Sequence, residues 1–230
     1  MHRVLLIIAL ITVGMDAILV QRAAAQTFLE EPFKNPTEDR GLPRVLLIGD
    51  SISIGYTTRV RRLLHEMASV YRPPTNCRWS AWGAEHLEEW LEPGDWDVIH
   101  FNFGLWDWYG WSQQVKATPT SYANNLESIV TVLQRSKAKL IFAVTTPPCI
   151  GPEKKVRIVV SDESAEQFNQ AAITVMQKHD VQINDLYSVI AGQRSRFQRG
   201  PDDVHYNDAG RDLLAAHVAD AIRKALATRD

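Results

Sequence analysis

The stretch LLIGDSIS, residues 46–53, carries the strongest information on the fold. It begins as an apolar run and stops at Gly49, Asp50 and Ser51. Apolar residues without alternation are typical of a parallel strand that is buried on both faces. A serine between such a strand and a helix exposes its hydroxyl beside backbone N–H groups that favour negative charge. Ser51 is therefore either a nucleophile above a sheet or an ordinary helix N-cap.

Strands and helices alternate along the rest of the chain. The patterns predict strands at 44–50, 96–104, 138–148 and 181–187, and helices at 57–71, 84–91, 121–137, 164–180 and 207–226. Such alternation predicts an α/β fold of three layers, a doubly wound parallel sheet with helices on both faces. In these sheets ligands bind beyond the carboxyl ends of the strands. Ser51 follows one of those ends.

The first 43 residues differ from the rest. Residues 1–25 contain Arg3, an apolar run from Val4 to Met15 and three small residues that end at Ala25. We interpret them as a secretory signal peptide that is cleaved after Ala25, which predicts a secreted or periplasmic protein. The alternative is a membrane anchor, but Asp16 ends the run well short of the ~20 residues that span a bilayer. Residues 26–43 are a polar, proline-containing leader, and 44–230 form one domain.

Composition narrows the choice of partners. The 230 residues are 45% hydrophobic and 23% charged, with a net charge of −2, which is ordinary for a globular chain. No basic block supports a nucleic-acid partner, and no later segment suggests stable membrane insertion. Cys77 and Cys149 could form a disulfide or remain separate thiols, and neither has neighbours spaced as zinc ligands. The oligomeric state cannot be deduced.

A second candidate segment lies near the C-terminus. In GPDDVHYNDAGRDLL, residues 200–214, Asp202 and His205 lie three apart before the last helix. A serine hydroxyl becomes a strong nucleophile only when a base takes its proton, and a carboxylate must orient that base. One loop could supply both groups. The other histidines have no acid so placed, and we interpret them as surface, core or helix-face residues.

Together, IGDSIS and DDVHYNDAG resemble the GDSL-type SGNH hydrolase family of esterases and lipases, which have a flavodoxin-like fold. The resemblance spans about residues 44–226, with the motifs in the family's order. It implies Ser51 as nucleophile, His205 as base and Asp202 as acid. It also implies an oxyanion hole built from the Ser51 N–H and the N–H of Gly83, which lies in the stretch NCRWSAWGAEHLEEWL.

The third family motif departs from the usual G-x-N-D. The chain reads HFNFGLWDWYGW, residues 100–111, with Trp106 at the expected asparagine position. The stretch resembles the N-x-G-L-[HW]-D variant of some SGNH-like esterases, in which an asparagine precedes the glycine. This resemblance implies the side chain of Asn102 as the third oxyanion donor. Two alternatives remain open: Asn102 holds a loop by hydrogen bonds, or the Trp106 indole donates instead. Trp106 and Trp108 are the predicted substrate-binding residues, unless the aromatics only form a hydrophobic cluster.

The resemblance implies an exported serine esterase without metal or organic cofactor. Its expected substrates are short-chain acyl esters, above all O-acetyl groups on carbohydrate or small molecules. An acyltransferase with the same triad, or a carbohydrate-binding module without catalysis, remains an alternative. The segment EKKVR, residues 153–157, is interpreted as a solvated loop, with a basic path for an anionic substrate as the less favoured reading.

Overall fold

A parallel sheet forms the centre of the molecule. The computed structural model describes residues 29–37, 41–92, 94–111 and 116–228. Within them, five strands pair in the order β2-β1-β3-β4-β5, and every neighbouring pair is parallel. Their bounds are Arg44–Ile48 (β1), Ser69–Tyr71 (β2), Val98–Phe101 (β3), Lys139–Ala143 (β4) and Gln182–Asn184 (β5). The predicted doubly wound α/β architecture is confirmed.

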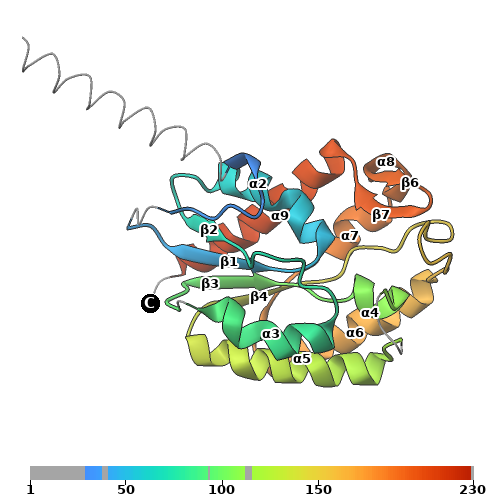
Figure 1. Cartoon of the computed structure of the whole chain (residues 1–230), viewed down its shortest axis with the longest axis horizontal. Helices are drawn as coiled ribbons and strands as arrows, with labels where there is room; N and C mark the ends of the chain where they lie inside the picture. The colour runs from blue at the N-terminus through green and yellow to red at the C-terminus, as the bar shows by residue number, and fades with distance from the viewer. Residues whose placement is uncertain (1–28, 38–40, 93, 112–115, 229–230) are drawn as a thin grey trace, which may run out of the picture.

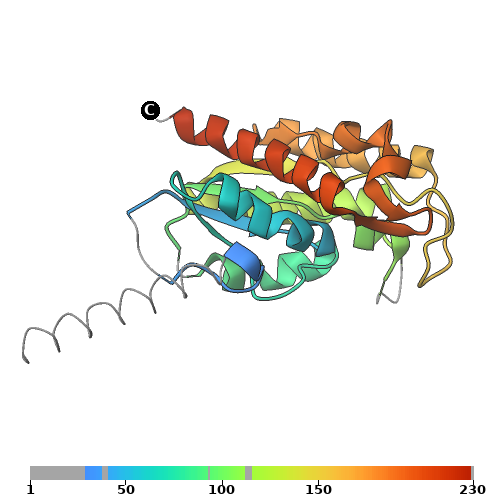
Figure 2. The same cartoon turned by 90° about the horizontal axis from the view of Figure 1, so that it is seen from above.

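Helices cover both faces of this sheet (Figure 1). On one face lie α2 (Ser51–Leu63) and α9 (Asp208–Ala227), which Figure 2 shows side by side. The other face carries α3 (Ser80–Leu91), α5 (Pro119–Leu133) and α6 (Asp162–Lys178). The apolar stripe predicted for the helix at 121–137 is fully buried, at Leu126, Ile129, Val130 and Leu133. Asn207 caps α9 by accepting from the Gly210 N–H, as its position in the sequence suggested.

Several short elements complete the part of the chain that the structure describes. They are α4 (Leu105–Tyr109), a 3₁₀ turn (Gln134–Ser136), α7 (Leu186–Ala191), α8 (Arg194–Phe197), β6 (Gln198–Gly200) and β7 (Asp203–Tyr206). β6 and β7 form an antiparallel hairpin. The predicted strand at 181–187 is shorter than expected, because Asp185 caps α7 by accepting from the Ser188 N–H.

The predicted helix at 57–71 is wrong at both ends. It begins six residues earlier, at Ser51, because Asp50 accepts the Ile52 N–H and caps it. It ends at Leu63, and the chain then turns into the short strand β2. Leu63 and Met67 fit the helical pattern but are 43% and 46% exposed.

One buried arginine of α2 binds the segment that precedes β1. Arg61 donates to the backbone oxygens of Glu31 and Lys34 and to Asn35 Oδ1. The described part of the predicted leader is therefore packed against α2. The predicted signal peptide, 1–25, lies outside the described residues. No helix in the described part is long and apolar enough to cross a membrane.

The two cysteines are not bonded to each other. Cys77 and Cys149 are free thiols, and both are buried. The Cys149 Sγ contacts the Tyr109 hydroxyl at 3.2 Å. Of the two alternatives left open by the sequence, the structure has the separate thiols.

Candidate active site

A chain of hydrogen bonds links the two predicted segments. Ser51 is the first residue of α2, and its Oγ lies 2.9 Å from Nε2 of His205 on β7. The other ring nitrogen of His205, Nδ1, lies 2.5 Å from Oδ1 of Asp203. Residues 154 positions apart thus meet at the carboxyl end of β1. This arrangement is that of a serine nucleophile, a base and an orienting acid.

The acid is not the residue that the sequence suggested. Asp203, rather than Asp202, contacts His205, so the predicted acid is corrected by one position. The cause is the strand β7, in which side chains two residues apart point to the same face. Asp203 and His205 share a face, whereas Asp202 lies in the preceding turn. Asp203 Oδ1 also accepts the His205 backbone N–H, which fixes the carboxylate.

Hydrogen bonds from buried polar groups stabilise the turn that carries Ser51. Arg72, 1% exposed, donates to the Gly49 carbonyl oxygen and to the hydroxyls of Ser53 and Thr57. Asp50 is also 1% exposed, and only its Oδ1 has a hydrogen-bond partner among the described residues. These contacts fix the strand-to-helix junction, so Ser51 has a defined position.

Asp50 and Asp203 both interact with His205, and burial and neighbouring charges shift the pKa of each in opposite directions. Burial raises the pKa of Asp50 to about 6, although the Ile52 N–H, His205 and Arg72 oppose the shift. Burial also favours the neutral form of Asp203, but the hydrogen bonds from Lys154 and His205 outweigh it. They lower the pKa of Asp203 to about 2. Asp203 is therefore a carboxylate throughout the physiological range.

The Gly83 N–H is not free to act as the predicted oxyanion donor. It lies inside α3, where its N–H donates to the Trp79 carbonyl oxygen at 2.9 Å. A side chain at Gly83 would overlap the buried ring of Phe103, so this glycine serves the contact between α3 and the segment after β3. The prediction placed the start of α3 too late in the sequence.

The first turn of α3 has N–H groups without a backbone acceptor in the part of the chain that the structure describes. Neither Ala81 nor Trp82 has a backbone acceptor among the described residues, as is usual at helix N-termini. This end of α3 lies at the carboxyl edge of the sheet: the Cys77 N–H donates to Gly49 O at 3.3 Å, and Ser80 Oγ donates to Asp107 of α4 at 2.6 Å. The Ser51 N–H likewise has no acceptor in the described part of the chain.

Asn102 has the holding role that was left open as an alternative. Its side-chain nitrogen donates to Ala143 O at 2.8 Å and to Thr145 Oγ1 at 3.0 Å. An amide nitrogen has two hydrogens, so both are engaged. Asn102 therefore joins the ends of β3 and β4, and the geometry does not favour it as an oxyanion donor.

The two predicted substrate-binding tryptophans have different environments. Trp108 is 0% exposed and packs against Phe168 of α6, so its prediction as a substrate-binding residue is wrong. Trp106 is half-buried, with its ring 6.1 Å from that of Trp79 and 5.6 Å from that of Trp111. Trp79, Trp106 and Trp111 thus form a partly exposed aromatic cluster beside the carboxyl edge of the sheet.

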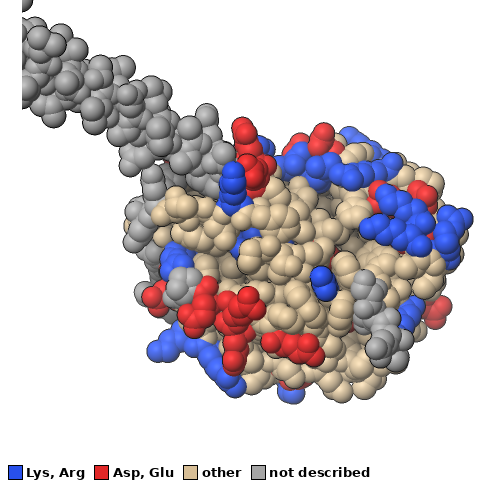
Figure 3. Space-filling view, viewed as in Figure 1, with Lys and Arg blue, Asp and Glu red and all other residues tan. Residues whose placement is uncertain are grey.

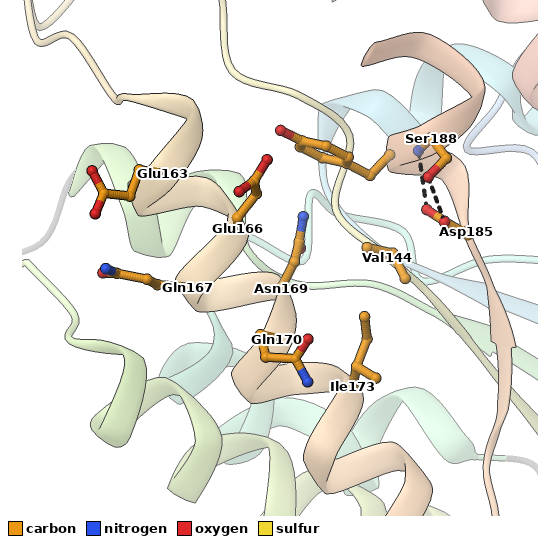
Figure 4. A pocket seen from close by; sticks show the side chains of 10 residues that line it. Val144, Glu163, Glu166, Gln167, Asn169, Gln170, Ile173, Asp185 and Ser188 are labelled. Carbon is orange, nitrogen blue, oxygen red and sulfur yellow. Dashed lines mark hydrogen bonds between the residues drawn. The ribbon is translucent and has the colours of Figure 1, made fainter. Parts of the chain in front are cut away.

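A separate cavity lies between α6 and the β5–α7 segment (Figure 4). It has a volume of ≈ 640 Å³, and Ser51, Asp203 and His205 do not line it. Its polar lining includes Glu163, Glu166 and Asp185. The described residues contain no group of three His, Cys, Asp or Glu side chains arranged to hold a metal ion.

Comparison of the sequence with protein-family profiles shows the family to which this chain belongs. The profile of the GDSL-like Lipase/Acylhydrolase family matches residues 47–213. The chain belongs to this family and is a carboxylic ester hydrolase with the SGNH hydrolase fold. No curated protein matches it by sequence.

Solved structures share the fold at low sequence identity. A lipase/acylhydrolase from Enterococcus faecalis has a TM-score of 0.67 and 20% identity over 80% of this chain and 96% of its own. The acetyl xylan esterase AlAXEase has a TM-score of 0.64 and 18% identity, over 78% and 99%. Axe2, an acetylxylan esterase from Geobacillus stearothermophilus, has a TM-score of 0.64 and 17% identity, over 78% and 94%.

Proposed function

We propose that the protein is a serine esterase that removes short acyl groups, above all O-acetyl groups, from carbohydrate. The observation that carries the proposal is the continuous contact from Ser51 through His205 to Asp203. Ser51 Oγ attacks the ester carbonyl carbon while His205 Nε2 takes its proton. The alcohol leaves with that proton, and an acyl-enzyme remains. Water, deprotonated by His205, then releases the acid and restores Ser51.

The oxyanion that forms in each step needs N–H donors. We assign this role to the Ser51 N–H and to the first turn of α3, at Ala81 or Trp82, in place of Gly83 and Asn102. These N–H groups lie at helix N-termini, which favour negative charge. When a phosphonate is attached covalently to Ser51, the amide proton resonances of the donors should move downfield. A shift at Gly83, with none at Ala81 and Trp82, would restore the original assignment.

Two features support carbohydrate as the alcohol. The half-buried rings of Trp79, Trp106 and Trp111 offer flat surfaces on which sugars can stack. The face in Figure 3 has charged side chains of both signs, mostly toward its margins, and extended uncharged areas between them. Two of the structures with the same fold are acetylxylan esterases. Export through residues 1–25 would bring such an enzyme to extracellular or periplasmic glycans. The mass of the secreted protein tests this, because cleavage after Ala25 removes residues 1–25.

The test compares the wild type with Ser51→Ala on p-nitrophenyl acetate, butyrate and octanoate and on acetylated xylo-oligosaccharides. We expect acetate to be the best ester, with kcat/KM at least about 10³-fold lower in the variant. Ser128→Ala, an exposed serine on α5, is the matched control and should retain full activity. A wild type that binds the oligosaccharide but hydrolyses no ester would favour the binding module. Acyl transfer to a sugar that exceeds hydrolysis would favour the transferase.

A further inference from the structure

The carboxylate of Asp203 has a second cationic partner. Oδ1 contacts the ring and the backbone N–H of His205, whereas Oδ2 accepts from Lys154 Nζ at 2.6 Å. The Asp203 side chain is 8% exposed and that of Lys154 is 43% exposed. The carboxylate therefore lies between the imidazole and a permanent positive charge. Lys154 belongs to the segment 153–157, which the sequence analysis interpreted as a solvated loop, with a basic path for an anionic substrate as the less favoured reading.

Lys154 is held in place by its own loop. Its backbone N–H donates to Asp202 O at 3.0 Å, which ties the loop to the turn before β7. The neighbouring Glu153 is 2% exposed, and its Oε2 accepts from the N–H groups of Lys155 and Val156 and from the Trp111 indole. An ion pair of a surface lysine usually loses free energy because the side chain must give up many rotamers. Here hydrogen bonds fix the backbone at and beside Lys154, so its side chain starts from a defined place near Asp203. The contact with Asp203 is thus part of a built arrangement.

We propose, on the basis of the proposed esterase function, that Lys154 is a positioning residue that sets the pH range in which His205 works as a base. Lys154 fixes Oδ2 of Asp203, so Oδ1 faces the imidazole. Its charge also offsets part of the carboxylate's negative charge, which would otherwise stabilise the protonated ring.

Other charged groups near the triad act in the opposite direction. Asp50, at the N-cap of α2, has an electrostatic interaction with His205 and, when ionised, favours the protonated ring. Asp202 and Glu153 have electrostatic interactions with the Lys154 ammonium, and their negative charges favour its protonated form. Arg72 offsets part of the Asp50 charge, whereas Lys154 is the cation in contact with Asp203 itself, so the removal of Lys154 has a defined sign.

The test is the pH profile of kcat/KM for p-nitrophenyl acetate in the wild type and in Lys154→Met. We expect the midpoint of the acidic limb to rise by about one pH unit in the variant. Activity at pH values below both midpoints should fall about tenfold, whereas activity on the alkaline plateau and KM should change little. Lys154→Arg, which keeps the charge, should restore the wild-type midpoint. Lys155→Met removes an exposed neighbouring charge and is the matched control.

A second measurement does not depend on turnover. The ring protons of His205, assigned with His205→Gln, should titrate with a midpoint about one pH unit higher in Lys154→Met than in the wild type. An unchanged midpoint in both measurements would overturn the proposal, even if kcat fell equally at all pH values. If the NMR midpoint moves but the wild type hydrolyses no ester, the electrostatic role stands and the esterase function fails.

Discussion

At the scale of single residues, the pair Asp202 and Asp203 shows what a motif leaves undecided. Both precede His205, and a D-x-x-H pattern favours the first. The strand β7 favours the second, because its pleat puts Asp203 on the same face as the histidine. The strand cannot be recognised in the sequence, since it has four residues and follows a tight turn.

This geometry predicts that the two aspartates differ strongly when each is changed to asparagine. Asp203→Asn should lower kcat/KM by about 10²–10⁴-fold, because an amide can no longer hold and stabilise the protonated ring. Asp202→Asn should lower it by less than about threefold. Ester hydrolysis at pH 7 measures both. The reverse order of effects would show that Asp202 is the acid and that the hairpin rearranges in solution.

The tryptophans of the third motif provide a second contrast between neighbours. Trp108→Ala should destabilise the fold by about 3–5 kcal/mol, since the side chain is fully buried. Trp106→Ala should leave the denaturation midpoint nearly unchanged but raise KM for acetylated xylo-oligosaccharide about three- to tenfold. Denaturant unfolding and steady-state kinetics separate the two effects. An equal increase in KM for p-nitrophenyl acetate would argue against sugar stacking at Trp106.

Which residues the sequence could identify depends on how local their signal is. Ser51 and His205 each lie in a motif that contains its own structural context, a strand end or the start of the last helix. Lys154 has no such signal, because its partner lies 49 residues away and the two meet only in the folded chain. Trp106 and Trp108 are two residues apart on α4, and burial alone distinguishes them.

At the scale of elements, helices with an apolar periodicity and strands with an apolar run were predictable, whereas elements without either pattern were not. α5, α6 and α9 were predicted from their periodicity, and β1, β3 and β4 from their apolar runs. β2 was hidden in a pattern that continued the preceding helix, and α4 lay in an aromatic run without helical periodicity. Short elements such as β2 and α4 take their conformation from tertiary contacts more than from local preference.

The contact of α3 with the segment after β3 gives a prediction at this scale. Gly83→Ala places a methyl group against the Phe103 ring, which is fully buried and cannot move away without displacing its neighbours. We expect a loss of about 1–3 kcal/mol in the free energy of unfolding. Guanidinium denaturation measures it.

A glycine on another helix is the matched control. A methyl group at Gly55 on α2 would meet only the Arg211 side chain, at 3.4 Å. Gly55→Ala should therefore be neutral or gain up to about 1 kcal/mol from helix propensity. Equal effects at the two positions would indicate that α3 shifts freely over the sheet.

At the scale of the whole molecule, the strand order explains where the site lies. After β1 the chain adds β2 on one side and then returns to add β3 on the other. Ligands bind at such a switch point, beyond the carboxyl ends of the strands. Ser51 lies three residues after the end of β1, and the contact of Ser80 with Asp107 joins the segments that follow β2 and β3. This placement could be predicted from the alternation of elements, but the distances between the loops could not.

The buried carboxyl that joins these loops makes the stability of the whole molecule depend on pH. Burial raises the pKa of Asp107 from 3.8 to about 7, against the opposing hydrogen bonds from Ser80. Between these values the folded state keeps a proton that the unfolded state has lost, so stability falls as pH rises from about 4 to 7. Asp50, whose pKa is also raised by burial, acts in the same direction, whereas His100, whose pKa burial lowers to about 4, acts oppositely.

Asp107→Asn isolates the contribution of Asp107, because Asp50 and His100 remain in both proteins and cancel in the difference. The asparagine oxygen can still accept from Ser80, and it carries no charge at any pH. The variant should therefore match the wild type near pH 4 and gain stability relative to it up to pH 7, on the order of 2 kcal/mol between pH 5 and 8. Denaturation curves of both proteins at four pH values test this. A difference that is constant with pH would mean that Asp107 is ionised in the folded state, with its charge balanced by the loops that it joins.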